Sequence, residues 1–446
     1  MVPQIPAGNN LNIPIMGRIL RGGGAIFMRR SFDNSLYSTI FFQHIQNLLR
    51  RGSSIEFFPE GGRSRSGLSL PSRPGLISMI LRSFTNLQSE NVKIVPIYIG
   101  YEKILEGQSY ISELSGSQKK RESLLDPFKV LRDFNNYLGN AYLSFGKPLD
   151  LERFLQENVS EDFHINSPLD RPDWLKPTTS LLGDEIIRSI NNSVAVSSTS
   201  LFAISLLTDP TQALNRETLK ARISFYLTLL SKSDRYKDVW ITEKDPDEII
   251  DRSERLKFIK HQLIGSDEVY RPSPIEVATL SFYKNNISHI FMLYSLICES
   301  VRYVEKISKA DMYALIQMVY PIISREYFLQ SSQIEEREIE NALKTLIEQG
   351  VLHSKESETY SKPDNNGGHF NKYLSLCNIC EPSLKRFYVT MSVLWKKKNI
   401  SKDKLQADCD LIANELERLE GWPYPEFSDK TKFQNFLSLL ITERYV

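Results

Sequence analysis

Cysteine is scarce in this chain, because its 446 residues contain only Cys298, Cys377, Cys380 and Cys409. Four thiols in a chain of this length do not make a disulfide framework, which predicts a reducing compartment. Cys377 and Cys380 form one Cys-x-x-Cys pair, but no second pair and no suitably spaced histidines follow it. Zinc binding is therefore disfavoured, and we expect two cysteines on a helix and no metal site.

Long apolar runs are also missing. No uncharged apolar stretch reaches the roughly 18 residues that a helix needs to span a bilayer. The longest candidate, residues 193–208, is short and rich in serine and threonine. We expect this stretch to form a buried helix, and we expect any contact of the chain with a membrane to be peripheral.

Lysine is absent from residues 1–82, and acids are rare there. This segment holds ten arginines against Asp33, Glu56 and Glu60, so its net charge is +7, whereas the remainder of the chain carries −6. The planar guanidinium group of arginine binds phosphate through paired hydrogen bonds, which the ammonium group of lysine cannot do. The arginine excess therefore indicates phosphate recognition, a basic surface that faces an anionic membrane, or both.

The composition is that of a globular protein of two or three domains, with 41% hydrophobic and 24% charged residues. Residues 1–150 alternate between strand and helix patterns. Strands are predicted at residues 25–28, 55–58, 93–101 and 141–146, and helices at residues 36–52 and 74–88. This alternation predicts an α/β layered fold with mostly parallel strand pairing.

The pattern changes after Asp150. Residues 166–177 are rich in proline and aspartate, and we interpret residues 151–180 as a connector to a mainly α-helical C-terminal domain, residues 181–446. No internal repeat is visible. Helices are predicted at residues 214–231, 247–263, 275–304 and 309–329.

Residues 333–355 leave an alternative open. They read as a helix, a glycine turn and a short extended stretch, an order that also occurs in winged-helix modules that bind nucleic acid. The surrounding region is acidic, however, and offers no basic recognition face. We therefore favour a helical packing domain and expect no nucleic acid among the partners.

The most informative stretch is FFPEGGRSRSG, residues 57–67, which follows a predicted buried strand. Ligands of α/β sheets sit beyond the carboxyl ends of the strands, so this loop lies where a ligand is expected. Gly61 and Gly62 permit backbone conformations that other residues avoid, and they allow a substrate to approach closely.

Three charged residues lie on the same loop. A buried Glu60 needs a partner, which Arg63 and Arg65 are close enough in sequence to supply. The alternative is a surface turn on which these charges only pair with one another. No Lys-Ser or Lys-Thr follows Gly67, which argues against a nucleotide phosphate loop.

Three blocks together carry a family resemblance: GAIFMRR at residues 24–30, FFPEGGRSRSG at residues 57–67 and IVPIYIGYE at residues 94–102. With them the sequence resembles the bacterial membrane-associated glycerol-3-phosphate acyltransferases, through nearly the whole chain. The resemblance includes AGNNLNIP near the start, SFYKNNISH at residues 281–289 and PEFSDKTKF at residues 425–433. It implies that residues 1–150 form an acyltransferase-type layered sheet with helices.

Three of the four motifs of this family have matching residues. The matches are Gly24, Phe27, Arg29 and Arg30 for the second motif, Phe58, Glu60, Gly61, Gly62, Arg63, Ser64 and Arg65 for the third, and Val95 and Pro96 for the fourth. By resemblance, the residues that bind glycerol 3-phosphate are Arg30, Glu60, Gly61, Arg63, Ser64 and Arg65. The residues that support them are Gly24, Phe27, Arg29, Gly62 and Pro96.

The resemblance also implies a role for individual residues. Arg30, Arg63 and Arg65 grip the phosphate through charge-assisted hydrogen bonds. Glu60 accepts from a glycerol hydroxyl or holds an arginine in place. Pro96 shapes the pocket or the path of the acyl chain.

The first motif of the family, His-x-x-x-x-Asp, has no match. No aspartate stands five positions after any of the six histidines, which are His44, His164, His261, His289, His353 and His369. In the family this histidine is the general base and the aspartate orients it, so no catalytic residue is identified in this chain. The sequence looks like the C-terminal portion of such an enzyme, through a truncated gene, a misassigned start or a fragment.

The resemblance implies acyl transfer from acyl-coenzyme A or an acyl-carrier thioester to the sn-1 hydroxyl of glycerol 3-phosphate, which gives lysophosphatidic acid without a cofactor. Because the His-Asp pair is absent, we expect the chain to be inactive alone. The alternative is a non-catalytic remnant that binds phosphate or a membrane. The expected partners are glycerol 3-phosphate, the acyl thioester and an anionic membrane surface, with peripheral attachment to the cytoplasmic face of the bacterial inner membrane.

Overall fold

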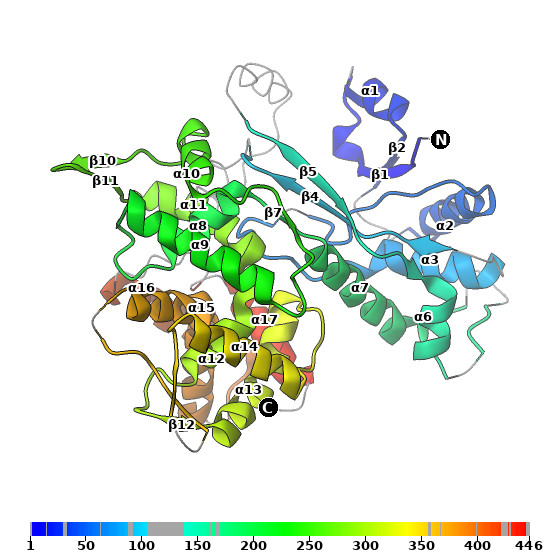
Figure 1. Ribbon diagram of the computed structural model, residues 1–446. Coiled ribbons are helices and arrows are strands. Elements are labelled where there is room, and N and C mark those ends of the chain that lie inside the picture. The colour runs from blue at the N-terminus through cyan, green and yellow to red at the C-terminus, as the bar shows by residue number, and fades with distance from the viewer. Residues whose placement is uncertain are drawn as a thin grey trace.

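The structure is a computed structural model of the chain. It describes residues 2–14, 16–29, 34–62, 64–87, 92–104, 138–160, 162–165, 170–355, 358–365, 367–397, 399–420, 427 and 430–442. Figure 1 shows an α/β part, which contains β1 to β6, beside a larger helical part that extends to α17. The predicted fold class, α/β followed by mainly α-helical, is confirmed. Within the described ranges, no helix is both long and apolar enough to cross a bilayer.

The α/β part forms from short strands and two amphipathic helices. Its elements are β1 (Ile5–Gly8), η1 (Asn9–Leu11), α1 (Met16–Gly22), β2 (Ala25–Met28), α2 (Ser35–Arg50), α3 (Pro74–Leu87), β3 (Lys93–Ile94), β4 (Ile97–Tyr101), β5 (Ala141–Phe145) and β6 (Leu149–Asp150). Two more helices follow, α6 (Leu151–Asn158) and α7 (Leu175–Asn192). The helices predicted at residues 36–52 and 74–88 are confirmed as α2 and α3.

Strand pairing is less parallel than the sequence predicts. β1 and β2 are parallel, and a parallel bridge joins Gln4 to Ile55. The pairs β3–β6 and β4–β5 are antiparallel, so the prediction of mostly parallel pairing is wrong for them. The predicted strand at residues 93–101 is interrupted before β4 by Pro96, which has no N–H to donate. The predicted strand at residues 55–58 forms only the bridge at Ile55.

One hydrophobic core holds the α/β part together. The side chains that α2 and α3 bury there include Phe42, Ile45, Ile80 and Phe84. An Asn34 side chain that accepts from the backbone of Tyr37 caps the start of α2. Residues 151–180, interpreted as a connector, contain α6 and the first turn of α7, and their buried side chains join the same core.

The helical part contains eleven more helical elements among the described residues. They are α8 (Ser198–Leu207), α9 (Arg216–Lys232), α10 (Pro246–Arg255), α11 (Pro274–Ser288), η2 (His289–Phe291), α12 (Met292–Glu299), α13 (Lys309–Tyr327), α14 (Glu336–Glu348), α15 (Gly368–Lys397), α16 (Lys402–Glu420) and α17 (Lys430–Thr442). The short strands are β7 (Ala195–Val196), β8 (Leu214–Asn215), β9 (Trp240–Ile241), β10 (Gln262–Ile264), β11 (Asp267–Tyr270), β12 (Ile307–Ser308), β13 (His353–Lys355) and β14 (Thr359–Ser361).

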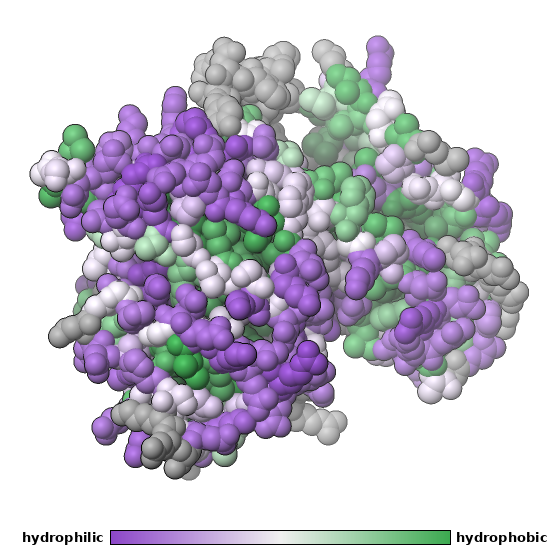
Figure 2. Space-filling model, viewed as in Figure 1, coloured by the Kyte–Doolittle hydropathy of each residue, from purple (hydrophilic) through white to green (hydrophobic). Residues whose placement is uncertain are grey.

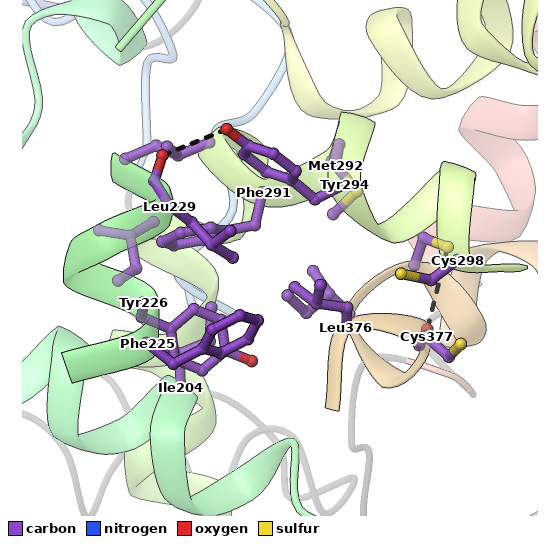
Figure 3. Packing of buried hydrophobic residues seen from close by; sticks show 14 of the residues in the cluster. Ile204, Phe225, Tyr226, Leu229, Phe291, Met292, Tyr294, Cys298, Leu376 and Cys377 are labelled. Carbon is purple, nitrogen blue, oxygen red and sulfur yellow. Dashed lines mark hydrogen bonds between the residues drawn. The ribbon is translucent and has the colours of Figure 1, made fainter. Parts of the chain in front are cut away.

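The core of the helical part surrounds α8, which is buried on all sides as predicted. Figure 3 shows side chains that come together there from α8, α9, η2, α12 and α15. Cys377 and Cys380 lie on α15, as expected, and both are buried. Burial raises the pKa of both thiols, so they pack as small apolar groups. The described residues contain no group of histidine, cysteine or acidic side chains that could hold a metal ion.

Although no repeat is visible in the sequence, the helical part contains the same topology twice. In copy 1, α8 is followed by β8, α9, α10 and the β10–β11 hairpin. In copy 2, α12 is followed by β12, α13, α14 and the β13–β14 hairpin. The strand orders are β10-β11-β8 and β13-β14-β12, all antiparallel, which is the winged-helix arrangement.

Local details of the two copies also correspond. Asn215 and Ser308 each end the first strand and cap the following helix with a side-chain oxygen. Lys257 and Gly350 each follow the third helix in the left-handed conformation, with φ of 57° and 67°. The exposed face of α14 carries three glutamates against Arg337 and Lys344, a charge pattern that does not favour a nucleic-acid phosphate backbone.

Candidate functional site around residues 57–67

The loop at residues 57–67 leaves the carboxyl end of a parallel arrangement. The Gln4 N–H donates to the carbonyl of Ser54 at 2.8 Å, and the Glu56 N–H donates to the carbonyl of Gln4 at 2.9 Å. On the other side of β1, the Ile5 N–H donates to the carbonyl of Gly24 at 2.9 Å. The segment after β2 and the loop after Glu56 therefore both leave parallel neighbours of β1 at the same edge.

The first half of the loop is a tight turn. The Gly61 N–H donates to the carbonyl of Phe58 at 3.1 Å, and the Arg73 N–H donates to the carbonyl of Pro59 at 2.7 Å. Gly61 has φ of 61°, and a Cβ atom there would stand 2.8 Å from Cγ of Arg73. The glycine is thus required both by the backbone angle and by a close side chain.

The second half of the loop is fastened to α11. Gly67 has φ of 82°, and a Cβ atom there would stand 2.0 Å from the carbonyl oxygen of Phe282. The side-chain amide of Asn285 donates to the carbonyl of Ser66 at 2.8 Å, and the Gly67 N–H donates to the hydroxyl of Ser64 at 3.0 Å. This half therefore packs against residues that lie more than two hundred positions later in the chain.

The residues that follow the loop enter the interior. Leu68 is 4% exposed and belongs to the core of the helical part. The Ser69 hydroxyl donates to the side-chain oxygen of Asn191 at 2.7 Å, and the amide of Asn191 donates to the carbonyl of Tyr327 at 2.9 Å. Nε2 of His289 lies 3.2 Å from the carbonyl oxygen of Asn191. One buried asparagine on α7 thus links the loop to two other elements of the helical part.

Glu60 is the titratable group with the most unusual environment in the loop. Burial raises the pKa of its carboxyl from 4.5 to about 7, although the Leu70 N–H and the charge of Lys432 act in the opposite direction. Lys432 lies on α17 and is 5% exposed. A carboxyl that titrates near neutral pH, beside a buried cation, is a common feature of functional sites.

The predicted site residues do not all lie together. Arg30 and Arg63 lie outside the described residues. Gly61, Gly62, Ser64 and Arg65 lie with Glu60 on the loop, where Gly61, Gly62 and Arg65 are exposed. The Arg29 N–H donates to the hydroxyl of Tyr37 at 2.9 Å, and its guanidinium lies 5.0 Å from the centre of that ring. The guanidinium of Arg21 lies 5.2 Å from the centre of the Phe27 ring. Pro96 is buried, and its carbonyl accepts from the Gly146 N–H at 2.8 Å.

Sequence reasoning missed the residues that hold the loop. Phe282 and Asn285 lie in the SFYKNNISH block, and Lys432 lies in the PEFSDKTKF block, so both blocks carried a signal without an assigned role. It also missed Glu102, the last residue of the IVPIYIGYE block.

Glu102 connects the two parts of the molecule. Its side chain is fully buried and accepts from Nε and Nη2 of Arg252 at 2.6 and 2.8 Å. It also accepts from the hydroxyl of Tyr142 at 2.8 Å and from the Asn140 N–H at 2.7 Å. Because Arg252 lies on α10, copy 1 of the winged-helix topology is fixed to the α/β part by a paired and hydrogen-bonded buried charge.

Comparison with known proteins identifies two family profiles. Residues 110–446 match the profile described as glycerol-3-phosphate acyltransferase C-terminal region, and residues 2–100 match the acyltransferase profile.

Curated relatives match over nearly the whole chain. The glycerol-3-phosphate acyltransferase of Pseudomonas aeruginosa (strain UCBPP-PA14) is 34% identical over 448 residues, which cover 99% of this chain and 54% of the relative. The protein of the same name from Pseudomonas putida (strain W619) is 34% identical with the same coverage, and that from Pseudomonas fluorescens (strain Pf0-1) is 32% identical over 98% and 53%. The chain spans about half the length of the curated relatives it matches.

Proposed function

Because the chain belongs to the glycerol-3-phosphate acyltransferase family, we propose that residues 57–67 bind glycerol 3-phosphate for acyl transfer. The observation that carries the proposal is the construction of this loop. It emerges at the same strand edge as the segment after β2, holds a carboxyl with a pKa of about 7, and is fastened by Asn285 and Phe282.

The chemistry of the substrate fits the residues of the loop. A phosphate dianion requires charge-assisted donors, which Arg30, Arg63 and Arg65 would supply. Glu60 in its carboxylate form would accept from a glycerol hydroxyl or orient one of the arginines. Ser64, Gly61 and Gly62 keep the loop compact enough for the substrate to approach the backbone.

The acyl-transfer step needs a base that removes the proton of the attacking hydroxyl. In this proposal the acyl group passes from an acyl-coenzyme A or acyl-carrier thioester to the sn-1 hydroxyl of glycerol 3-phosphate, the thiol leaves, and lysophosphatidic acid forms. Holding both substrates together makes the attack effectively unimolecular, so neither a cofactor nor an acyl-enzyme is required. Buried Pro96 would contribute to the wall of the pocket or to the path of the acyl chain.

The general base of this reaction is not among the residues identified. A positioned base typically contributes about 10²–10⁴-fold to the rate, so we expect negligible acyl transfer by the 446-residue chain alone. The alternative function is that of a non-catalytic remnant that binds phosphate or a membrane. Such a remnant would use the same loop but would not transfer an acyl group. Robust turnover by the purified chain would contradict the expectation of inactivity and would assign the role of base to one of its six histidines.

The experiment that tests the proposal uses a version of the chain extended by a relative's segment that carries His-x-x-x-x-Asp. Arg63→Lys and Arg30→Lys keep the charge but lose the paired hydrogen bonds, so the KM for glycerol 3-phosphate should rise about ten- to a hundredfold. The KM for the acyl donor should stay nearly unchanged. A rise in the donor KM alone would place the loop on the wrong substrate, and unchanged constants would leave it a surface turn.

The arginine excess of residues 1–82 supports a second element of the proposal, peripheral attachment to an anionic membrane at the cytoplasmic face of the bacterial inner membrane. Each basic residue near such a surface contributes about 1 kcal/mol, and the attraction falls as salt rises. Flotation with anionic liposomes at low and high salt measures it. Binding to neutral vesicles that is equally strong and indifferent to salt would contradict it.

A further inference from the structure

One face of the second half of α15 presents large apolar side chains to solvent. Tyr388 is 75% exposed, Met391 is 51% exposed and Trp395 is 85% exposed. With the half-buried Leu384 they follow one another at spacings of four, three and four residues, so they form one row along the helix (the α15 row). By contrast, Figure 2 shows a mainly hydrophilic surface over α10.

The α15 row is not needed to pack the helix. Phe387 stacks on Phe436 of α17 with ring centres 4.1 Å apart, and Val389 and Val393 are buried in the core that α15 shares with α16 and α17. The three exposed members of the row belong to no hydrophobic cluster of the described residues. Their large apolar groups therefore serve no contact within this part of the chain.

The helix that carries the row is basic on either side of it. No acid stands between Glu381 and Asp403 in the sequence, whereas that stretch contains Lys385, the buried Arg386 and three lysines at residues 396–398. The row itself therefore has no carboxylate from its own helix at its depth.

The acid that precedes the row is paired. Glu381 lies about two helical turns before Tyr388, and its carboxylate lies 3.1 Å from the guanidinium of Arg302 and 3.1 Å from Nζ of Lys385. Arg302 also pairs with Glu299. These two acids and two cations cancel one another, so this end of the row is neutral.

The other end of the row carries an excess of cations. Residues 396–404 contain five lysines and one acid, Asp403, and residues 430–442 of neighbouring α17 contain no acid. Lys397 donates to the carboxylate of Asp408 on α16 at 2.6 Å. Lys396 and Lys404 are exposed, and neither forms an ion pair with an acid among the described residues. The charge beside Trp395 is therefore positive.

The β10–β11 hairpin lacks this combination. Leu263 is 71% exposed and Ile264 is 61% exposed, but the strand register places Glu268 and Asp267 directly opposite them. An anionic surface would repel these carboxylates. The hairpin is therefore a comparison surface that is as apolar as the α15 row and opposite in charge.

A lipid surface suits the α15 row better than a second copy of the chain does. Exposed aromatic side chains bury about 150–250 Å² each, so the row would bury about 400 Å² in all, whereas a stable interface buries about 800 Å² per partner. An antiparallel pair of helices centred on Met391 would also bring Lys385 of one copy close to Lys396 of the other. Tryptophan and tyrosine, which combine an apolar ring with a polar tip, favour the membrane–water interface.

We propose that α15 is an interfacial anchor that lies in the plane of an anionic bilayer, with Tyr388, Met391 and Trp395 at the boundary between headgroups and acyl chains. Lys396 and the lysines that follow it would meet the lipid phosphates. The inference rests on the peripheral attachment proposed above, and it names the helix that makes the contact.

The first test places a probe on the row. The variant Met391→Cys can be labelled selectively with an environment-sensitive fluorophore, because the four native cysteines are buried. The control is Ile264→Cys on the β10–β11 hairpin. With vesicles of phosphatidylethanolamine and phosphatidylglycerol, emission from the label at position 391 should shift to the blue, and emission from the label at position 264 should not. Binding of the chain to these vesicles without a shift at position 391 would overturn the proposal.

The second test removes the two aromatic groups. Tyr388→Gln with Trp395→Gln should lower the vesicle partition coefficient about tenfold or more, at low and at high salt. Lys396→Gln with Lys404→Gln should lower it at low salt only. The control is Leu263→Gln with Ile264→Gln, which changes two comparably exposed residues and should have no effect. All the changed side chains are exposed, so the variants should keep the fold.

Three further outcomes would contradict the proposal. Equal loss with the control pair would show that any exposed apolar residue serves. A blue shift at position 391 that depends on protein concentration and needs no vesicles would assign the row to a contact between copies of the chain. A shift caused by an acidic acyl-carrier protein and not by vesicles would assign it to a protein partner. Neither test measures acyl transfer, so the inference can fail while the proposed function stands, and the reverse.

Discussion

The α/β part and the helical part bury their side chains to different degrees, and the loop at residues 57–67 depends on both. The strands β1 and β2 are half-exposed along their whole length, whereas every residue of α8 is buried. The groups proposed to bind glycerol 3-phosphate, Glu60 and Arg65, come from the α/β part. The groups that fix the shape of the loop, Phe282 and Asn285, come from the helical part. The side chains proposed to contact the substrate therefore belong to the α/β part, whereas the contacts that hold the loop in shape come from the helical part.

The largest effect is expected where the two parts are joined. Arg252→Ala would leave the fully buried Glu102 without its cation, and breaking a buried pair in this way typically costs about 3–5 kcal/mol. Urea unfolding should show this loss in the free energy of unfolding. Arg255→Ala on the same helix is the control, because that side chain is 49% exposed and its ion pair should contribute less than about 1 kcal/mol. Equal losses in the free energy of unfolding for the two variants would contradict the claim that the pair Arg252–Glu102 joins the two parts.

The next effect concerns the close approach between the loop and α11. Gly67→Ala places a Cβ atom against the carbonyl of Phe282 and strains a backbone with positive φ, so we expect a loss of about 2–3 kcal/mol. Gly62→Ala is the matched control, because nothing lies within 4 Å of its Cβ position and its cost should stay below about 0.5 kcal/mol. If Gly67→Ala is as mild as its control, the loop is not fastened to the helical part as described.

A smaller effect follows from the pKa of Glu60. Its folded-state pKa of about 7 exceeds the ordinary value of 4.5, so the folded chain binds more protons than the unfolded chain between these two values. The stability contributed by this group is therefore full below about pH 4.5 and is lost as the pH rises through 7. Because Glu60 is only partly buried, we expect the loss to be about 2 kcal/mol or less. Glu60→Gln should remove this part of the pH dependence, and an unchanged profile would contradict the raised pKa.

Some of this structure could be predicted from the sequence because its signals are local. The apolar spacing in α2 and α3 and the uncharged stretch of α8 each depend on neighbouring residues. The pairing of residues 93–101 could not be predicted, since it depends on how Pro96 divides the strand between β5 and β6. The repeat was missed because the two copies share topology and caps, such as Asn215 and Ser308, with little shared sequence.

The candidate site, too, could be predicted only where its signal is local in the sequence. Its loop was found because Glu60, Gly61 and Arg65 form a compact motif in the sequence. Asn285 and Lys432 could not be assigned to it, because contacts across more than two hundred residues leave no periodic or spacing signal. The blocks that contain them stood out only through the family resemblance.

The central claim is that a loop shaped by the helical part binds glycerol 3-phosphate, and a calorimetric titration of the purified chain with this compound tests it most directly. The chain should bind glycerol 3-phosphate and should not bind glycerol at the same concentration. Asn285→Ala, which removes the hydrogen bond to Ser66, should weaken binding about three- to tenfold, whereas Asn158→Ala, at an exposed position of α6, should leave it unchanged. Equal binding by the Asn285→Ala variant and the unaltered chain, or no binding by the latter, would contradict the account.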